Sequence, residues 1–136
     1  FFSTFGGSTV SCVVAREVLD IVDEERLQDN AKTTGDYLLE GLKELVNRHP
    51  LVGDARGMGF FIGVELVLDA KTLEPATSLA SYVKNRLRDH RILIGTDGPH
   101  DNVLKIRPPL TFSHKDADLL LATLDNILQE SPCVIS

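Results

Sequence analysis

The sequence contains few cysteines and no set of residues spaced like metal ligands. Cys12 and Cys133 are too few to form a disulfide framework, and their spacing matches no zinc motif. The four histidines are scattered along the chain, so we expect no metal site. This cysteine content favours a reduced, intracellular compartment, either cytoplasmic or mitochondrial.

Positive charge and long apolar runs are also scarce. The chain has 14 lysines and arginines against 20 acidic residues, which gives a formal net charge of −6. Nucleic acids and anionic membranes are bound by clustered cations, so we expect neither partner. No apolar run approaches the length of a membrane span, and the apolar start lacks the basic residues of a secretory signal.

The 136 residues, 43% of them hydrophobic, fit one globular domain. Apolar periodicity and glycine positions predict helices over residues 9–22, 25–48 and 76–91 and after residue 112, an antiparallel strand pair within residues 51–68, and short strands at 92–94 and 103–107. A tight turn near residues 57–59 should join the first pair. This order predicts an α+β fold of two layers, in which helices cover a short antiparallel sheet.

Local features refine three of these helices. The first is apolar nearly all the way round, which predicts burial on more than one side and makes Cys12 a small buried hydrophobe. Gly35 and Gly41 weaken the second helix by about 1 kcal/mol each relative to alanine, which indicates that something packs closely against them. Ser113, followed three residues later by Asp116, predicts a capped start for the last helix.

The first residues of the chain combine hydroxyl groups with adjacent glycines before a helix. Thr4, Gly6 and Gly7 precede Ser8 and Thr9. Such a segment is typical of a turn with a Ser or Thr N-cap. It also suits an anion such as a phosphate, because the first turn of a helix offers unpaired N–H groups and the positive end of the dipole.

Three charged residues on the predicted strands are candidates for function. Glu65 is either a general base or, more often for such a residue, an edge charge or the ion-pair partner of Arg56. Alternation along the strand places Lys105 and Arg107 on one face. These two cations form either an anion-binding site for substrate or a solvated strand face.

Several motifs together resemble the C-terminal part of class-III aminotransferases, which are pyridoxal-phosphate enzymes of fold type I. They are residues 4–12 (Thr-Phe-Gly-Gly-Ser-x-Val-Ser-Cys), 53–66 (Gly-Asp-x-Arg-Gly-x-Gly-x-Phe-Ile-Gly-Val-Glu-Leu) and 108–110 (Pro-Pro-Leu). Residues 96–105 (Thr-Asp-Gly-Pro-x-x-Asn-Val-Leu-Lys) and 75–77 (Pro-Ala-Thr) are similar to the alanine–glyoxylate-aminotransferase-2-like branch. That branch includes ethanolamine-phosphate and phosphohydroxylysine phospho-lyases.

The resemblance implies roles for individual residues. Thr4, with Gly6 and Gly7, would bind the phosphate of the cofactor held by a neighbouring subunit, which implies a homodimer. Many members carry Arg-x-x-Pro-Pro, whose arginine holds the substrate α-carboxylate, whereas this chain has Lys105 there and Arg107 directly before the prolines. This difference favours a phospho-lyase acting on a phosphorylated amine or amino acid. An aminotransferase using pyruvate or glyoxylate, and a non-catalytic module sharing only the fold, are the alternatives.

The resemblance also implies a division of the chain. Residues 1–22 would be an interdomain loop and helix, and residues 23–136 the C-terminal small domain. The family's cofactor-bonding lysine lies upstream of the Thr-x-Gly-Gly motif, and no lysine of this chain occupies that context. We therefore expect no catalytic residue here and an inactive fragment of a larger enzyme, because cofactor chemistry needs that lysine.

Overall fold

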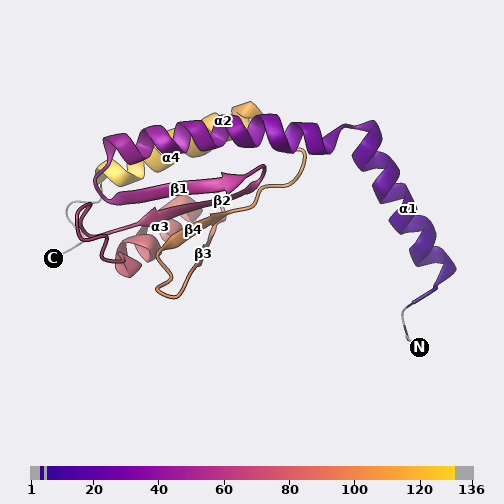
Figure 1. Ribbon diagram of the computed structural model, residues 1–136, viewed down its shortest axis with the longest axis horizontal. Helices are drawn as coiled ribbons and strands as arrows, with labels where there is room; N and C mark the ends of the chain where they lie inside the picture. The colour runs from indigo at the N-terminus through magenta and orange to yellow at the C-terminus, as the bar shows by residue number, and fades with distance from the viewer. Residues whose placement is uncertain (1–3, 5, 131–136) are drawn as a thin grey trace.

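A computed structural model describes residue 4 and residues 6–130 of the chain. Within these residues, helices α2, α3 and α4 pack on a four-stranded antiparallel sheet, while α1 extends away from the sheet (Figure 1). This is the α+β two-layer fold that the sequence predicts. The helices are α1 (Thr9–Glu24), α2 (Leu27–Arg48), α3 (Thr77–Asp89) and α4 (His114–Glu130), and the strands are β1 (Val52–Met58), β2 (Phe61–Leu66), β3 (Gly95–Asp97) and β4 (Val103–Ile106).

The sheet has the strand order β1-β2-β4-β3, with every neighbouring pair antiparallel. Met58 pairs with Phe61, so only two residues turn the chain between β1 and β2. The first of them, Gly59, has φ +54°, a conformation that glycine adopts without steric cost. The predicted strand pair and its turn near residues 57–59 are confirmed.

The hydrophobic core lies between one face of the sheet and helices α2, α3 and α4. Strands β2 and β4 alternate, so every second side chain points into this core. Each large apolar side chain buried in this way contributes about 1.5–3 kcal/mol. The core residues from these elements include Leu38, Leu42, Leu45, Ile62, Val64, Leu66, Leu79, Val83, Leu87, Leu104, Ile106, Leu120, Leu124 and Ile127.

Two predicted helix ends are confirmed to within two residues. The break expected near Asp23 falls at Glu25 and Arg26, and Arg26 takes a left-handed φ of 52°. At the start of α4, the Ser113 N–H and hydroxyl both donate to the Asp116 carboxylate, at 3.0 and 2.6 Å. The Asp116 N–H donates back to the Ser113 hydroxyl at 3.3 Å, which completes the reciprocal cap. Proline cannot continue a helix, so the sequence also predicts that the last helix ends at Pro132, which lies outside the described residues.

The buried strand expected at residues 92–94 is wrong. Leu93 is 86% exposed, and the strand β3 forms three residues later. The reason is the way in which α3 ends: Arg91 adopts φ +65°, and the Ile92 N–H donates to the Leu87 carbonyl at 2.9 Å. This Schellman-type ending uses the backbone of residues 91 and 92, although glycine, its usual marker, is absent.

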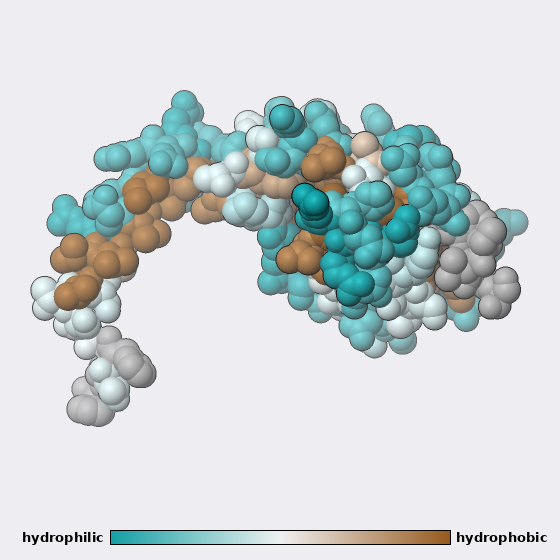
Figure 2. Space-filling view, turned by 180° about the vertical axis from the view of Figure 1, so that it is seen from behind, coloured by the Kyte–Doolittle hydropathy of each residue, from teal (hydrophilic) through white to brown (hydrophobic). Residues whose placement is uncertain are grey.

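Helix α1 also differs from the sequence prediction, because none of its residues is buried. Cys12 is exposed, so the expectation of a small buried hydrophobe is wrong for this chain. Figure 2 shows apolar surface along this extended helix. Its exposed apolar side chains are Val10, Val13, Val14, Val18, Leu19 and Ile21. No helix within the described residues has the length and apolar character needed to cross a membrane.

Gly35 and Gly41 pack closely against their neighbours, as the sequence indicates. A Cβ at Gly35 would lie 2.3 Å from the Gly59 carbonyl oxygen, so α2 contacts the β1–β2 turn backbone to backbone. A Cβ at Gly41 would lie 2.4 Å from a terminal methyl group of Leu121. The first neighbour is fixed backbone, whereas the second is the end of a side chain that can rotate.

We therefore predict that two alanine substitutions in α2 differ in their effect on stability. Gly35→Ala should lower the free energy of unfolding by about 1–3 kcal/mol, because the overpacked contact exceeds the gain in helix propensity. Gly41→Ala is the matched control and should leave stability nearly unchanged, because Leu121 can move. Urea denaturation followed by circular dichroism measures both, and equal stabilities for the two variants would contradict the prediction.

Candidate functional site

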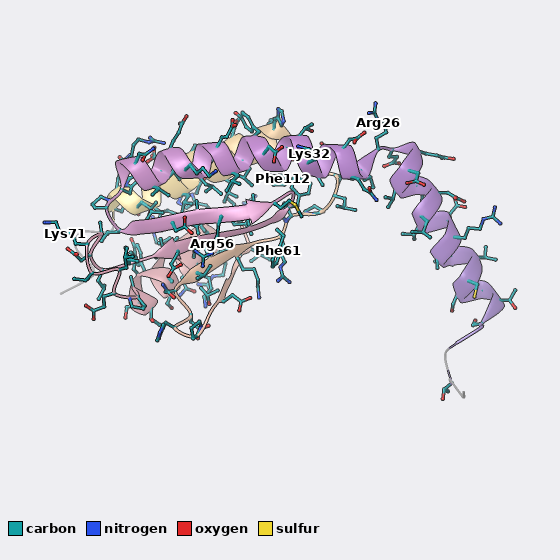
Figure 3. The ribbon with its side chains drawn as sticks, viewed as in Figure 1. Arg26, Lys32, Arg56, Phe61, Lys71 and Phe112 are labelled. Atoms are coloured by element: carbon teal, nitrogen blue, oxygen red, sulfur yellow. The ribbon has the colours of Figure 1, made fainter. Side chains whose placement is uncertain are left out.

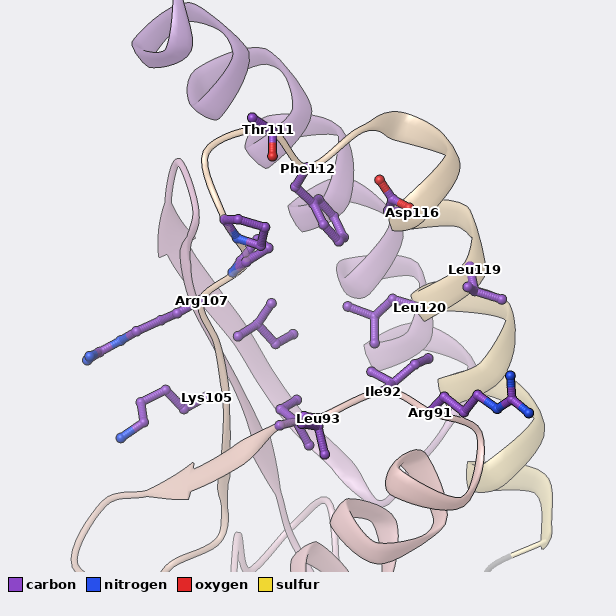
Figure 4. A pocket seen from close by; sticks show the side chains of 14 residues that line it. Arg91, Ile92, Leu93, Lys105, Arg107, Thr111, Phe112, Asp116, Leu119 and Leu120 are labelled. Atoms are coloured by element: carbon purple, nitrogen blue, oxygen red, sulfur yellow. The ribbon is translucent and has the colours of Figure 1, made fainter. Parts of the chain in front are cut away.

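The face of the sheet that carries no helix displays the charged strand residues. In β4, Leu104 and Ile106 are 0% and 4% exposed and face the core. Lys105 and Arg107 lie on the opposite side, and Figure 4 shows both side chains pointing away from α4. The predicted alternation is therefore confirmed, and the two cations lie together on what we call the open face of the sheet.

Lys105 lies between two glycines. Its partner across β2 is Gly63, and its partner across β3 is Gly95. Directly opposite residues in a sheet normally bring their side chains together, so the two glycines place no side chain directly opposite Lys105 on either strand. A Cβ at Gly95 would lie 3.6 Å from the Lys105 Cε, and one at Gly63 would lie 3.1 Å from a methyl group of Val103.

The Lys105 ammonium is paired with a carboxylate from β3. Its Nζ lies 3.0 Å from the Asp97 Oδ2. The Asp97 Oδ1 accepts a hydrogen bond from the Gly98 N–H at 2.9 Å. The hydrogen bond from Lys105, followed by that from Gly98 and by the charges of Lys105 and Arg107, holds the pKa of Asp97 below its ordinary value.

The Arg107 guanidinium lies over an aromatic ring of the neighbouring strand. Its Cζ is 4.4 Å from the centroid of the Phe61 ring, which is the geometry of a cation–π contact. Figure 3 shows Phe61 and Arg56 on the same side of the sheet. The ring holds the guanidinium in place and leaves its N–H groups available for an anion.

Arg56 is held by two carboxylates. One of its terminal nitrogens lies 2.7 Å from the Asp54 Oδ2 and 2.7 Å from the Glu65 Oε2. The hydrogen bonds that Arg56 donates to these carboxylates raise the pKa of Arg56. Of the interpretations of Glu65, the ion pair with Arg56 is confirmed. The pair engages the Glu65 oxygen that a general base would use to accept a proton, so this arrangement does not favour that role.

Two hollows adjoin these residues. The first, of about 360 Å³, lies on the open face and is lined by Arg56, Gly57, Phe61, Ile62, Gly63, Asp97, Val103 and Lys105. The second, of about 430 Å³, lies between β4 and α4 (Figure 4), and its walls combine apolar side chains such as Ile92, Phe112 and Leu120 with the cations Arg91, Lys105 and Arg107. Lys105 lines both hollows, so the candidate binding site is the surface around Lys105 that the two hollows share.

The Thr4 segment lies at the far end of α1, distant from Lys105 (Figure 1). Ser8 caps α1 by accepting a hydrogen bond from the Ser11 N–H at 3.5 Å, as the N-cap interpretation predicts. Gly7 has φ +77°, and Thr4, Gly6 and Gly7 are exposed. Hydroxyl groups and the N–H groups of a helix N-terminus can donate hydrogen bonds to a phosphate group, so this segment fits one side of a cofactor phosphate site. Phe5, within the same motif, lies outside the described residues.

The sequence did not reveal Asp97 and Phe61 as members of the site. Both contacts depend on the pairing of β4 with its two neighbours. Once a strand at residues 95–97 is paired with residues 103–105, Asp97 falls diagonally across from Lys105. The misplaced strand at 92–94 concealed that relation.

Comparison with known proteins gives a consistent family. Residues 2–128 match the family model described as aminotransferase class-III. An alanine–glyoxylate aminotransferase 2-like protein of Drosophila melanogaster is 44% identical over 122 residues, which are 89% of this chain and 25% of that protein. The chain thus spans about a quarter of the length of this curated relative.

Solved structures agree with this comparison. A phospholyase from Arthrobacter in complex with phosphoethanolamine superposes with a TM-score of 0.93 at 38% identity, covering 97% of this chain and 31% of that one. An amine transaminase from an uncultivated Pseudomonas species, solved in its pyridoxal-phosphate-bound form, has a TM-score of 0.85 at 33% identity. The superposed region covers 96% of this chain and 29% of the transaminase chain.

The Lys105–Asp97 pair predicts a specific pH dependence. Lys105→Gln should raise the pKa of Asp97 toward its ordinary value, as measured by NMR titration of its carboxyl carbon, because the main cause of the lowered pKa is lost. Because folding lowers this pKa, the pair stabilises the fold above the unfolded-state pKa of Asp97. That stabilisation disappears as the pH falls through the folded-state value.

Lys43→Gln serves as the control, because it removes the same charge from the exposed side of α2. It should leave the Asp97 titration unchanged. A similar shift in both variants would mean that net charge, rather than the contact with Lys105, sets the pKa of Asp97.

Proposed function

Because this chain belongs to the class-III aminotransferase family, we propose that it is the C-terminal part of a longer pyridoxal-phosphate enzyme that acts as a phospho-lyase. Residues 23–136 form the small domain and residues 1–22 the interdomain loop and helix. The substrate is a phosphorylated amine or amino acid, and the enzyme is an intracellular homodimer, cytoplasmic or mitochondrial.

The observation that carries this proposal is the lysine at position 105. A lysine ammonium is a compact point charge, whereas an arginine presents a fork that fits a carboxylate through two parallel hydrogen bonds. With Arg107 on the same face and a glycine directly opposite on each neighbouring strand, Lys105 suits a phosphate group better than an α-carboxylate. The likeness to a phospholyase solved with phosphoethanolamine supports the same substrate class.

The cofactor would supply an electron sink at the amine-bearing carbon, which is the chemistry shared by lyases and aminotransferases of this type. The residues of this chain have positioning roles. The Thr4 hydroxyl and the backbone of Gly6 and Gly7 bind the cofactor phosphate of the neighbouring subunit. Lys105 and Arg107 bind the phosphate of the substrate. The cofactor-bonding lysine comes from the rest of the longer protein, so the chain alone is inactive.

A second candidate is an aminotransferase that passes the amino group to pyruvate or glyoxylate. The identity of 44% to an alanine–glyoxylate aminotransferase 2-like protein favours it. In that case Lys105 would bind a carboxylate through a single ammonium group, which gives less geometric specificity than an arginine fork.

Phosphate release separates the two candidates. We expect the full-length protein, loaded with pyridoxal phosphate, to release inorganic phosphate from O-phosphoethanolamine without a keto acid. Lys105→Ala should raise KM for this substrate about ten- to a hundredfold, because it removes a hydrogen bond between charged groups, whereas Lys43→Ala should leave KM unchanged. Turnover that requires pyruvate or glyoxylate would show that the enzyme is an aminotransferase instead.

The role of Thr4 is tested by cofactor affinity. In the full-length protein, Thr4→Ala should raise the Kd for pyridoxal phosphate about tenfold, the effect of losing one hydrogen bond to a charged acceptor. Thr9→Ala is the matched control, since it removes the same hydroxyl five residues further along, within α1. Absorbance titration of the cofactor-free protein measures both constants. Equal affinities in the wild type and Thr4→Ala would remove Thr4 from the site.

A further inference from the structure

We propose that Asp97 is an internal competitor for the anion-binding position at Lys105, and that the anionic group of the substrate must displace its carboxylate. The inference rests on the proposed function, because it takes Lys105 to be the residue that receives that group. Without ligand, the site is occupied by an anion from its own chain.

The first support is the placement of Asp97 on the sheet. Asp97 pairs with Val103, while Lys105 pairs with Gly95, so the two charged residues are diagonal neighbours on the open face. Because Gly95 has no side chain, the Asp97 carboxylate reaches Lys105 directly, at 3.0 Å. The Asp97 carboxylate therefore occupies the position beside the Lys105 ammonium group that an anionic ligand would have to take.

The second support is that this ion pair can open. The Lys105 and Asp97 side chains are 33% and 57% exposed, and ion pairs in contact with water are weak. Asp97 also has a second partner, because its other oxygen, Oδ1, accepts a hydrogen bond from the Gly98 N–H at 2.9 Å. A carboxylate that leaves Lys105 thus keeps one hydrogen bond and gains water, so release leaves no polar group unsatisfied.

The third support is the chemistry of the exchange. A competitor within the chain lowers the apparent affinity of every anion by the same factor, which sets a threshold for binding. An α-carboxylate offers Lys105 one charge and two oxygens, which is what Asp97 already offers. A phosphate monoester carries a charge of about −1.5 to −2 and three acceptor oxygens, so Lys105 and Arg107 can share it. Phosphate esters therefore displace Asp97 from Lys105 more readily than carboxylates do.

The test measures affinity rather than turnover. Inorganic phosphate is titrated by calorimetry into the full-length enzyme after loading with pyridoxal phosphate, so that the cofactor's own phosphate position is filled. Asp97→Asn should lower the phosphate Kd about two- to fivefold, the range expected when a weak internal ion pair is removed. Asparagine can still accept from the Gly98 N–H, which preserves the turn.

Asp101→Asn is the matched control. Asp101 lies in the loop between β3 and β4, four residues after Asp97; it forms no ion pair within residues 6–130 and has a φ of 50°, which asparagine tolerates. The Asp101→Asn variant loses the same charge as Asp97→Asn, so the Kd of the Asp101→Asn variant for phosphate should stay close to that of the wild type. In a Lys105→Gln background, Asp97→Asn should give no tightening, because the competition requires the lysine.

The outcomes separate the two proposals. Equal tightening by Asp97→Asn and Asp101→Asn, or tightening that persists without Lys105, would show a general charge effect and overturn the competition. If Lys105→Gln weakens phosphate binding but Asp97→Asn does not strengthen it, only the competition fails. If Lys105→Gln leaves phosphate binding unchanged, Lys105 does not receive the anion, and the site assignment in the proposed function fails with it.

Discussion

A shift of one residue in the pairing of β4 would exchange the faces of Leu104 and Lys105. Side chains alternate along a strand, so this shift would place an ammonium group in the core and an apolar side chain in water. β4 is hydrogen-bonded on both sides, to β2 and to β3, and two neighbours hold its register. The same register places a glycine on each side of Lys105. Packing and binding chemistry therefore depend on one alignment.

The cations of the open face differ in how many carboxylates they pair with. Arg56 is held by two carboxylates, and Lys105 is held by one. Arg107 forms no ion pair within residues 6–130 and instead rests on the Phe61 ring. An incoming anion therefore finds Arg107 available, Lys105 available after one exchange, and Arg56 engaged. This gradation follows from which residues are cross-strand neighbours, and net charge alone does not reveal it.

Local chemistry made much of the fold predictable, whereas features that depend on distant partners were not. The turn at Gly59, the cap at Ser113 and the alternation around Lys105 each follow from a few adjacent residues. The end of α3 was missed because Arg91 takes a conformation that usually marks glycine. That error hid β3 and, with it, the contact of Asp97 with Lys105. The exposure of Cys12 was missed because apolar periodicity reports what a helix can bury, and not whether a partner is present.

The break between α1 and α2, at Glu25 and Arg26, directs α1 away from the rest of the fold (Figure 1). Sixteen helical residues at 1.5 Å per residue span about 24 Å, and the left-handed Arg26 lies at the base of that span. The backbone torsion angles of Glu25 and Arg26 therefore set the direction of α1 relative to the sheet. In the proposed homodimer, Thr4 at this distance would reach the cofactor site of the neighbouring subunit and not that of its own subunit. A substitution at Glu25 or Arg26 would then alter a site in another subunit, while the domain that carries the substitution stays folded.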